Sequence, residues 1–90
     1  MCDLRDIQHM IEKKYFVKDF SRGLENTALW FVEEVGELAE AIIKGDIKSL
    51  KEEMADVLAW LVSIANLVNV DLCEAFKEKY GEIDESTSND

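Results

Sequence analysis

The 90-residue sequence has no proline, four glycines and one histidine. With so few proline and glycine residues, little in the sequence interrupts a helix, and a single histidine limits the metal sites that the chain can form. Because no segment alternates polar and apolar residues, nothing indicates a β-sheet, and the sequence predicts helices throughout. The histidine and two distant cysteines, Cys2 and Cys73, fit no zinc-ligand pattern. Two such thiols fit a reducing cytosol, with a disulfide between them as the alternative.

Basic residues are also scarce, since ten lysines and arginines stand against 20 acidic residues and the formal net charge is −10. Nucleic acid polymers are bound by clustered Lys and Arg, so this composition argues against such a partner. A phosphate-bearing ligand would need metal cations between it and the protein. No run approaches the roughly 18 apolar residues of a membrane span, and the start of the chain lacks the apolar stretch of a signal peptide. The sequence predicts a cytoplasmic protein that contacts no membrane.

Apolar residues recur at helical spacing in four segments. The expected helices cover residues 3–15, 24–44, 47–68 and 71–80. Ser21 and Gly23 predict a turn after the first helix, and Gly45 predicts the end of the second. Because only two or three residues separate the second and third helices, these form an antiparallel hairpin. The expected domain is 1–81, followed by an acidic, disordered tail at 82–90.

Two helix starts carry capping residues. Asp46 is expected to cap the third helix, and Asp71 with Glu74 forms a capping box for the fourth. The third helix contains the stretch VLAWLVSIANLV, which is apolar almost all round apart from Ser63 and Asn66. Such a helix must be covered on every side, and three other short helices cannot easily surround it. The predicted fold is all-α, with about four helices per chain that assemble with a second chain into a dimeric helical bundle or a larger even assembly.

Acidic residues interrupt the apolar segment WFVEEVGELAEAI at residues 30–42. At roughly 100° per residue, Glu34 and Glu37 fall on one flank of an apolar stripe centred on Val35, with Trp30 between them. The third helix repeats this arrangement around Leu61. There the acidic pair is Glu53 and Asp56, next to Trp60, on the flank of the same hand.

Antiparallel helices that pack face to face bring flanks of the same hand to the same side, so the hairpin gathers four carboxylates. In water at about 4 Å, each like-charge pair costs on the order of 1 kcal/mol, and more when partly buried. The cluster must therefore take up protons or bind cations. Oxygen ligands without imidazole or thiolate favour Mg²⁺, Mn²⁺ or Ca²⁺. Because Mg²⁺ commonly combines a few carboxylates with substrate phosphate oxygens, the pattern points to a phosphoanhydride substrate.

Simpler interpretations exist for each of these residues. A single E-x-x-E pair is usually a solvated helix face, and only the doubled motif indicates a metal site. By residue type, Trp30 and Trp60 are more typical of a core or a dimer interface than of base stacking. His9 is typical of a surface residue, and Arg22 and Lys79 can be ordinary surface charges.

Three strings together resemble a known family: ENTALWFVEEVGELAEAI, KEEMADVLAWLVSIANL and VDLCEAFKEKYG. They are similar to the MazG-like nucleotide pyrophosphohydrolases of the all-α NTP pyrophosphatase superfamily, whose signature is E-E-x-x-E, a spacer, and E-x-x-D. Glu33, Glu34 and Glu37 match the first part. Glu53 and Asp56 match the second part after a spacer of fifteen residues.

The resemblance implies a helical dimer, with dimers sometimes pairing into tetramers, that uses Mg²⁺, or Mn²⁺ in its place, to hydrolyse a nucleoside triphosphate to the monophosphate and pyrophosphate. It implies that the metal is held by four carboxylates, Glu34, Glu37, Glu53 and Asp56. It implies a water-orienting role for Glu33, with Glu34 or Glu37 as catalytic base. The substrate-binding residues would be Trp60, Lys79, Arg22 and Trp30.

Three alternatives stay open at this point. Phosphoribosyl-ATP pyrophosphohydrolases have a similar acidic helix and cleave a similar bond. A dimeric helical interaction module would have no chemistry, and a metal-binding module would bind a divalent cation without turnover. The doubled acidic motif favours metal chemistry, because a scaffold has no need to concentrate charge against a core.

Overall fold

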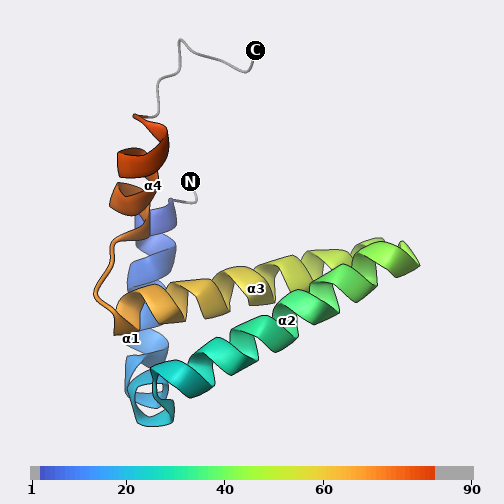
Figure 1. The fold of residues 1–90 in the computed structure, drawn as a ribbon, viewed down its shortest axis with the longest axis horizontal. Coiled ribbons are helices and arrows are strands. Elements are labelled where there is room, and N and C mark those ends of the chain that lie inside the picture. Colours follow the sequence, from blue (N-terminus) through green and yellow to red (C-terminus); the bar gives the residue numbers. More distant parts are fainter. Residues whose placement is uncertain (1–2, 83–90) are drawn as a thin grey trace.

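The computed structural model describes residues 3–82, and these form four α-helices and no strand. The helices are α1 (Leu4–Arg22), α2 (Leu24–Lys44), α3 (Ile47–Leu67) and α4 (Leu72–Tyr80). In Figure 1, α2 and α3 run antiparallel as a long hairpin, α1 crosses one end of it, and α4 lies beside the first half of α1. The all-α prediction is confirmed for these residues. The predicted tail, apart from Glu82, and Cys2 lie outside the described residues.

The turn between α2 and α3 lies where its capping residues predict. Gly45 closes α2 in the left-handed conformation, with φ 69°, and its amide donates to the carbonyls of Ala41 and Ile42. Asp46 caps α3 by accepting from the Ser49 amide at 3.3 Å. Since Gly45 tolerates a positive φ that other residues resist, the chain reverses here within two residues. The α2 bounds match the prediction, and α3 ends one residue earlier than predicted.

The first helix was predicted too short, because it continues from residue 15 to Arg22 through the expected turn. No proline or glycine precedes Gly23, so nothing in VKDFSR breaks a helix. Phe16 and Phe20, one turn apart, stack with ring centroids 6.0 Å apart. The extra turns end at Gly23, where φ is 91°.

The core is small and lies where α1 crosses α3. Val62 is fully buried there, with Ile11 and Ala65 beside it. Apart from Ala28, the least exposed residues of α2 form one row, called here the α2 row: Thr27, Phe31, Glu34, Leu38 and Ala41. The corresponding half-buried row of α3 is Leu50, Glu53, Val57, Trp60, Ile64 and Leu67. Each row has the heptad-like spacing of packed antiparallel helices.

The predicted centres of the apolar stripes were wrong. Val35 is 40% exposed and Leu61 is 38% exposed, so neither marks the buried face. The apolar stripe of α2 is wider than one packing face, and only the side against α3 is covered. Val32 and Ile43 of α2 stay largely exposed. As a result Glu34 lies within the covered row instead of on its flank.

No single helix within residues 3–82 is both long and apolar enough to cross a membrane. Only α3 and α4 taken together meet such a test, and they are bent by 95° at the break between them.

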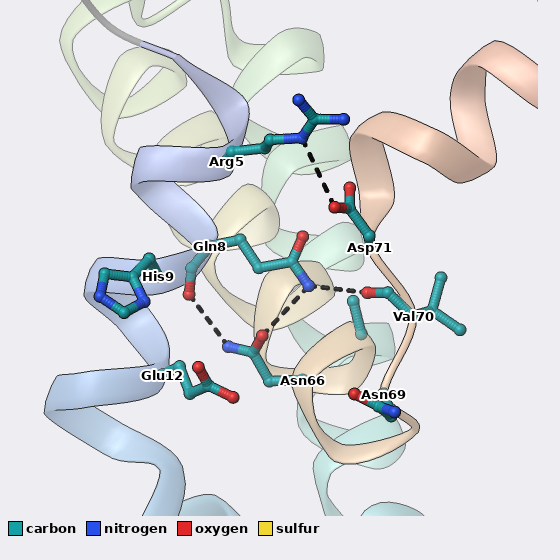
Figure 2. Close-up of a pocket in the computed structure, with 9 residues that line it drawn as sticks. Arg5, Gln8, His9, Glu12, Asn66, Asn69, Val70 and Asp71 are labelled. Atoms are coloured by element: carbon teal, nitrogen blue, oxygen red, sulfur yellow. Dashed lines mark hydrogen bonds and ion pairs between the residues drawn. The ribbon is translucent and has the colours of Figure 1, made fainter.

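Hydrogen bonds of Gln8 and Asn66, called here the polar latch, hold the connection between α3 and α4 against α1 (Figure 2). The Gln8 side chain donates to the Asn66 side-chain oxygen at 3.1 Å and to the Val70 carbonyl at 2.7 Å. The Gln8 side-chain oxygen accepts from the Leu72 amide at 3.0 Å, and Asn66 Nδ2 donates to the Gln8 backbone carbonyl at 3.2 Å. These side chains line a cavity of about 250 Å³. Asn66 is almost fully buried, so its hydrogen bonds fix the start of α4.

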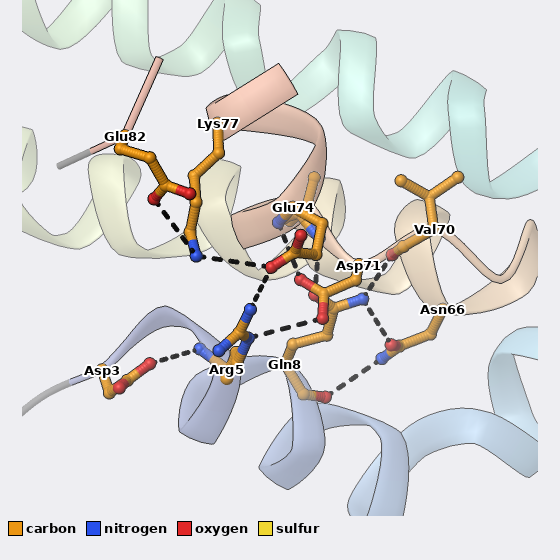
Figure 3. A network of polar contacts seen from close by, with 10 residues as sticks. Asp3, Arg5, Gln8, Asn66, Val70, Asp71, Glu74, Lys77 and Glu82 are labelled. Atoms are coloured by element: carbon orange, nitrogen blue, oxygen red, sulfur yellow. Dashed lines mark hydrogen bonds and ion pairs between the residues drawn. The ribbon is translucent and has the colours of Figure 1, made fainter. Parts of the chain in front are cut away.

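Charged residues extend this latch along α4 (Figure 3). Arg5 pairs with Asp71, Nε to Oδ2 at 3.5 Å, and with Glu74. Lys77 pairs with Glu74 at 3.4 Å, and the Glu74 charge raises the pKa of Lys77. The pairs are solvent-exposed and each contributes little, so Gln8 and Asn66 set the position of α4.

We predict that Gln8→Ala lowers the free energy of unfolding by about 1–3 kcal/mol, because it leaves the buried Asn66 Oδ1 and the Leu72 amide without their side-chain partner. Thermal unfolding at one fixed protein concentration measures this, with roughly 4–8 °C expected per kcal/mol in a domain of this size. Glu12→Ala, which removes an exposed side chain one turn along α1, is the control. Equal melting temperatures for the two variants would contradict the latch.

Candidate metal centre

Three carboxylates from the hairpin meet on one side of it. Glu34 and Glu37 project from α2 and Glu53 from α3, and one oxygen of each lies within 4.8 Å of the other two. Asp56 is exposed and is not one of the three, although its charge raises the pKa of both Glu34 and Glu53. Glu33 is exposed and lies outside the group. The structure thus brings together three of the four predicted ligands, with the fourth nearby.

The surroundings of these carboxylates disfavour their negative charge. Burial removes water from Glu34, and the adjacent Glu37 carboxylate adds to the effect, so the pKa of Glu34 rises to about 7. Burial, followed by the charge of Glu37, also raises the pKa of Glu53. Within residues 3–82, Glu34 Oε2 and Glu53 Oε1 are buried without a hydrogen-bond partner. Buried acceptor oxygens of this kind need a proton or a cation.

The residues present fit a hard divalent cation. All the ligands are carboxylate oxygens, which Mg²⁺ and Mn²⁺ prefer, and no histidine or cysteine belongs to the group. Beside the carboxylates lies a cavity of about 260 Å³, lined by Glu37 and Glu53 and by Lys44 and Ser49 near the hairpin turn. The cavity leaves room for water or phosphate oxygens, which Mg²⁺ usually keeps in its coordination shell.

Aromatic rings adjoin the carboxylates. Trp30 precedes Glu34 by one turn and Trp60 follows Asp56 by one turn, and the two rings stack with centroids 6.0 Å apart and an interplanar angle of 12°. The Arg22 guanidinium carbon lies 4.8 Å from the centre of the Trp60 ring. Cation–π attraction favours this position. Three of the predicted substrate-binding residues, Arg22, Trp60 and Trp30, therefore form one stack next to the candidate metal centre.

Lys79, the fourth predicted substrate-binding residue, is placed elsewhere. It lies on α4, which packs mainly against α1, and its ammonium is 5.6 Å from the Tyr80 ring centre. Within one chain the structure does not bring it to the carboxylates (Figure 1).

One charged residue of this region has no role in the sequence prediction. Asp19 is only 3% exposed and accepts from Arg22, Nη1 to Oδ1 at 2.8 Å. Asp19 belongs to the stretch that was expected to form a turn, so its position on a helix face was not considered. The D-x-x-R spacing, which places opposite charges on one helix face, was the available signal.

The family model described as MazG nucleotide pyrophosphohydrolase domain matches residues 22–85. The match covers more than half of the chain, and the chain belongs to this family. It begins at the last residue of α1 and includes all four predicted ligands. A comparison with curated proteins gives no match. The resemblance inferred from the two acidic motifs is confirmed.

The raised pKa of Glu34 predicts how stability depends on pH in metal-free protein. Since the folded-state pKa, about 7, exceeds the ordinary value of 4.5, the folded state binds this proton more tightly than the unfolded chain. The contribution of Glu34 to stability should therefore fall as pH rises between these two values and stay constant above. Glu34→Gln should reduce this decline and raise the melting temperature at pH 8.

Thermal unfolding from pH 4 to pH 8 in a chelating buffer measures the effect. Glu25→Gln, in the exposed first turn of the same helix, is the control. If the melting temperature of Glu34→Gln follows the same pH curve as that of native protein, the pKa of Glu34 is not raised in the folded state.

Proposed function

We propose that this chain is a Mg²⁺-dependent nucleoside triphosphate pyrophosphohydrolase, which converts an NTP or dNTP and water into the monophosphate and pyrophosphate. The observation that carries the proposal is the group of Glu34, Glu37 and Glu53 with oxygens within 4.8 Å of one another. Two buried oxygens of this group lack a partner within the described residues, so the hairpin is suited to hold a cation. The family match agrees with this chemistry.

Glu34, Glu37, Glu53 and Asp56 would hold Mg²⁺, or Mn²⁺ in its place. A bound divalent cation neutralises phosphate charge and polarises the anhydride bond that breaks. Glu34 or Glu37 accepts the proton of the attacking water. Glu33, exposed on α2 directly before Glu34, would orient that water. Holding water and phosphate in fixed positions supplies much of the rate increase in phosphoryl chemistry.

The stacked Trp30 and Trp60 rings and Arg22 would hold the nucleotide beside the carboxylates. Trp60, which contacts Trp30 and Arg22, lines a cavity that could take part of a base, and Arg22 carries the nearby positive charge that phosphate or base oxygens need. Lys79 keeps a phosphate-binding role only if assembly brings α4 of another chain to this site.

A second copy of the chain is the partner we propose for the exposed apolar side chains. Leu29 is 68% exposed, Val32 65% and Ile43 85%, all on α2. Exposed apolar surface on this scale is typical of protein interfaces. A homodimer, or a dimer of dimers, in the cytoplasm would cover it, since obligate dimers often have no stable folded monomer.

We predict that Glu37→Gln and Asp56→Asn each lower Mg²⁺-dependent pyrophosphate release by about 100-fold or more, because each removes a ligand and leaves the helical packing unchanged. Pyrophosphate release from a panel of NTPs and dNTPs, with circular dichroism of each variant, measures both effects. Glu25→Gln should retain native activity. Full activity in Glu37→Gln would end the proposal.

The same panel, with phosphoribosyl-ATP added, separates the alternatives. We expect turnover of ordinary nucleotides, whereas turnover of phosphoribosyl-ATP alone would identify the related activity instead. Mg²⁺ should raise the melting temperature, because a ligand that binds only the folded state stabilises it. A rise without turnover of any triphosphate indicates metal binding only. No rise and no turnover indicates an interaction module.

A further inference from the structure

Asp19 leaves one of its oxygens without a partner. The side chain is nearly fully buried on α1, and Oδ1 accepts from Arg22 at 2.8 Å. Within residues 3–82, Oδ2 is buried and has no hydrogen-bond partner. A buried, ion-paired carboxylate has further acceptor capacity that is costly to leave unused. Oδ2 is therefore an unused acceptor that an N–H or O–H donor entering beside it could satisfy.

The carboxylate borders a cavity that could admit such a donor. The cavity, of about 250 Å³ between α1 and α3, is lined by Ile11, Tyr15, Lys18, Asp19 and Arg22 on one side and by Ala59, Trp60 and Ser63 on the other. Pockets for whole drug-sized ligands are larger, roughly 300–1,000 Å³. This one suits a ring-sized part of a ligand. It has an aromatic wall, and Asp19 is the one acidic residue in its lining, beside the basic Lys18 and Arg22.

The cavity lies at the right place along α3 to take part of a ligand held by the metal centre. At roughly 1.5 Å per residue, Trp60 and Ser63 are roughly 6 and 10 Å beyond Asp56 along the helix axis. Seven residues make nearly two full turns, so Ser63 is on the same side of α3 as Asp56. A nucleotide whose phosphates bind at the carboxylates could therefore place its base in this cavity.

We propose that Asp19 determines base specificity: its Oδ2 accepts a hydrogen bond from the exocyclic amino group of a base in this cavity, which selects adenine, guanine or cytosine over uracil and thymine. The inference rests on the proposed function and adds the class of substrate. An amino group projects beyond the ring and can reach a carboxylate at the wall of a small cavity. The ring N–H of uracil or thymine lies between two carbonyl oxygens, which the carboxylate repels.

Three pairs of triphosphates that differ by one amino group test the proposal: ATP and purine riboside triphosphate, GTP and ITP, and CTP and its 2-pyrimidinone analogue. For the preferred base, loss of the amino group should lower kcat/KM in native protein by about 10-fold or more, since hydrogen bonds to charged groups are strong. In Asp19→Asn and Asp19→Ala this ratio should fall below about 3-fold, because the charged acceptor is gone. Asp6→Asn, an exposed change on the same helix, should keep the native ratio.

A purely structural role for Asp19, such as fixing Arg22 on Trp60, gives a different result. Both members of each pair would then lose activity equally, and the unchanged ratio would overturn the proposal. Two results in native protein alone would also overturn the proposal, even if no Asp19 variant folds. One is a preference for uracil or thymine nucleotides, and the other is a kcat/KM ratio near 1 between the members of each pair.

Binding separates this inference from the proposed function. The two tryptophans, Trp30 and Trp60, both lie at the site, so their fluorescence reports nucleotide binding. If the same pairs bind with Mg²⁺ but are not turned over, the proposed activity is wrong. The Asp19 proposal is still supported in that case if the amino group strengthens binding by about 10-fold or more. Binding that is indifferent to the amino group, or no binding at all, would overturn the Asp19 proposal.

Discussion

Repulsion among carboxylates in the middle of a helix hairpin is the constraint on which the rest of this structure depends. Glu34 occupies the α2 row between Phe31 and Leu38, a position where an apolar side chain would stabilise the packing of α2 on α3. Instead the row carries a group whose pKa rises to about 7 because burial and Glu37 oppose its charge. The hairpin gives up stability at this point, and the cation site that we propose would restore that stability on binding.

The other elements hold this unfavourable arrangement in place. Gly45 and Asp46 reverse the chain so tightly that the acidic pairs of α2 and α3 must face one another. Trp30 and Trp60 stack one turn from the carboxylates and limit how far the helices can separate there. The crossing of α1 over α3 supplies the buried core, so the acidic region is supported from outside. The buried core and the acidic group therefore lie in neighbouring parts of a small chain.

Much of the fold could be predicted because its signals are local. The bounds of α2 follow from Gly23 and Gly45, and the start of α4 from Asp71, which caps it through the Glu74 amide. The end of α1 was missed because the apolar pattern breaks in VKDFSRGLEN and this break was interpreted as a turn, although the helix ends only at Gly23, where φ is positive. The site was predicted in part, since helical spacing alone brings acidic residues of neighbouring helices to one side.

What could not be predicted depends on packing between elements that are distant in sequence. The buried face of α2 was assigned to the centre of a wide apolar stripe, but α3 covers one edge of it, and this places Glu34 inside. The proposed role of Asp19 likewise depends on the packing of α1 against α3, which places Asp19 and Trp60 at one cavity. The position of α4 follows from Gln8, 58 residues before Asn66, and separates Lys79 from the carboxylates.

The most direct test of the shared cation site is a crystal structure of the protein grown with Mn²⁺ and a non-hydrolysable triphosphate, with the ion located by its anomalous scattering. The account predicts an anomalous peak among the carboxylates of Glu34, Glu37 and Glu53, bridged to phosphate oxygens. Well-ordered carboxylates with no peak between them, or an ion bound elsewhere on the chain, would contradict it.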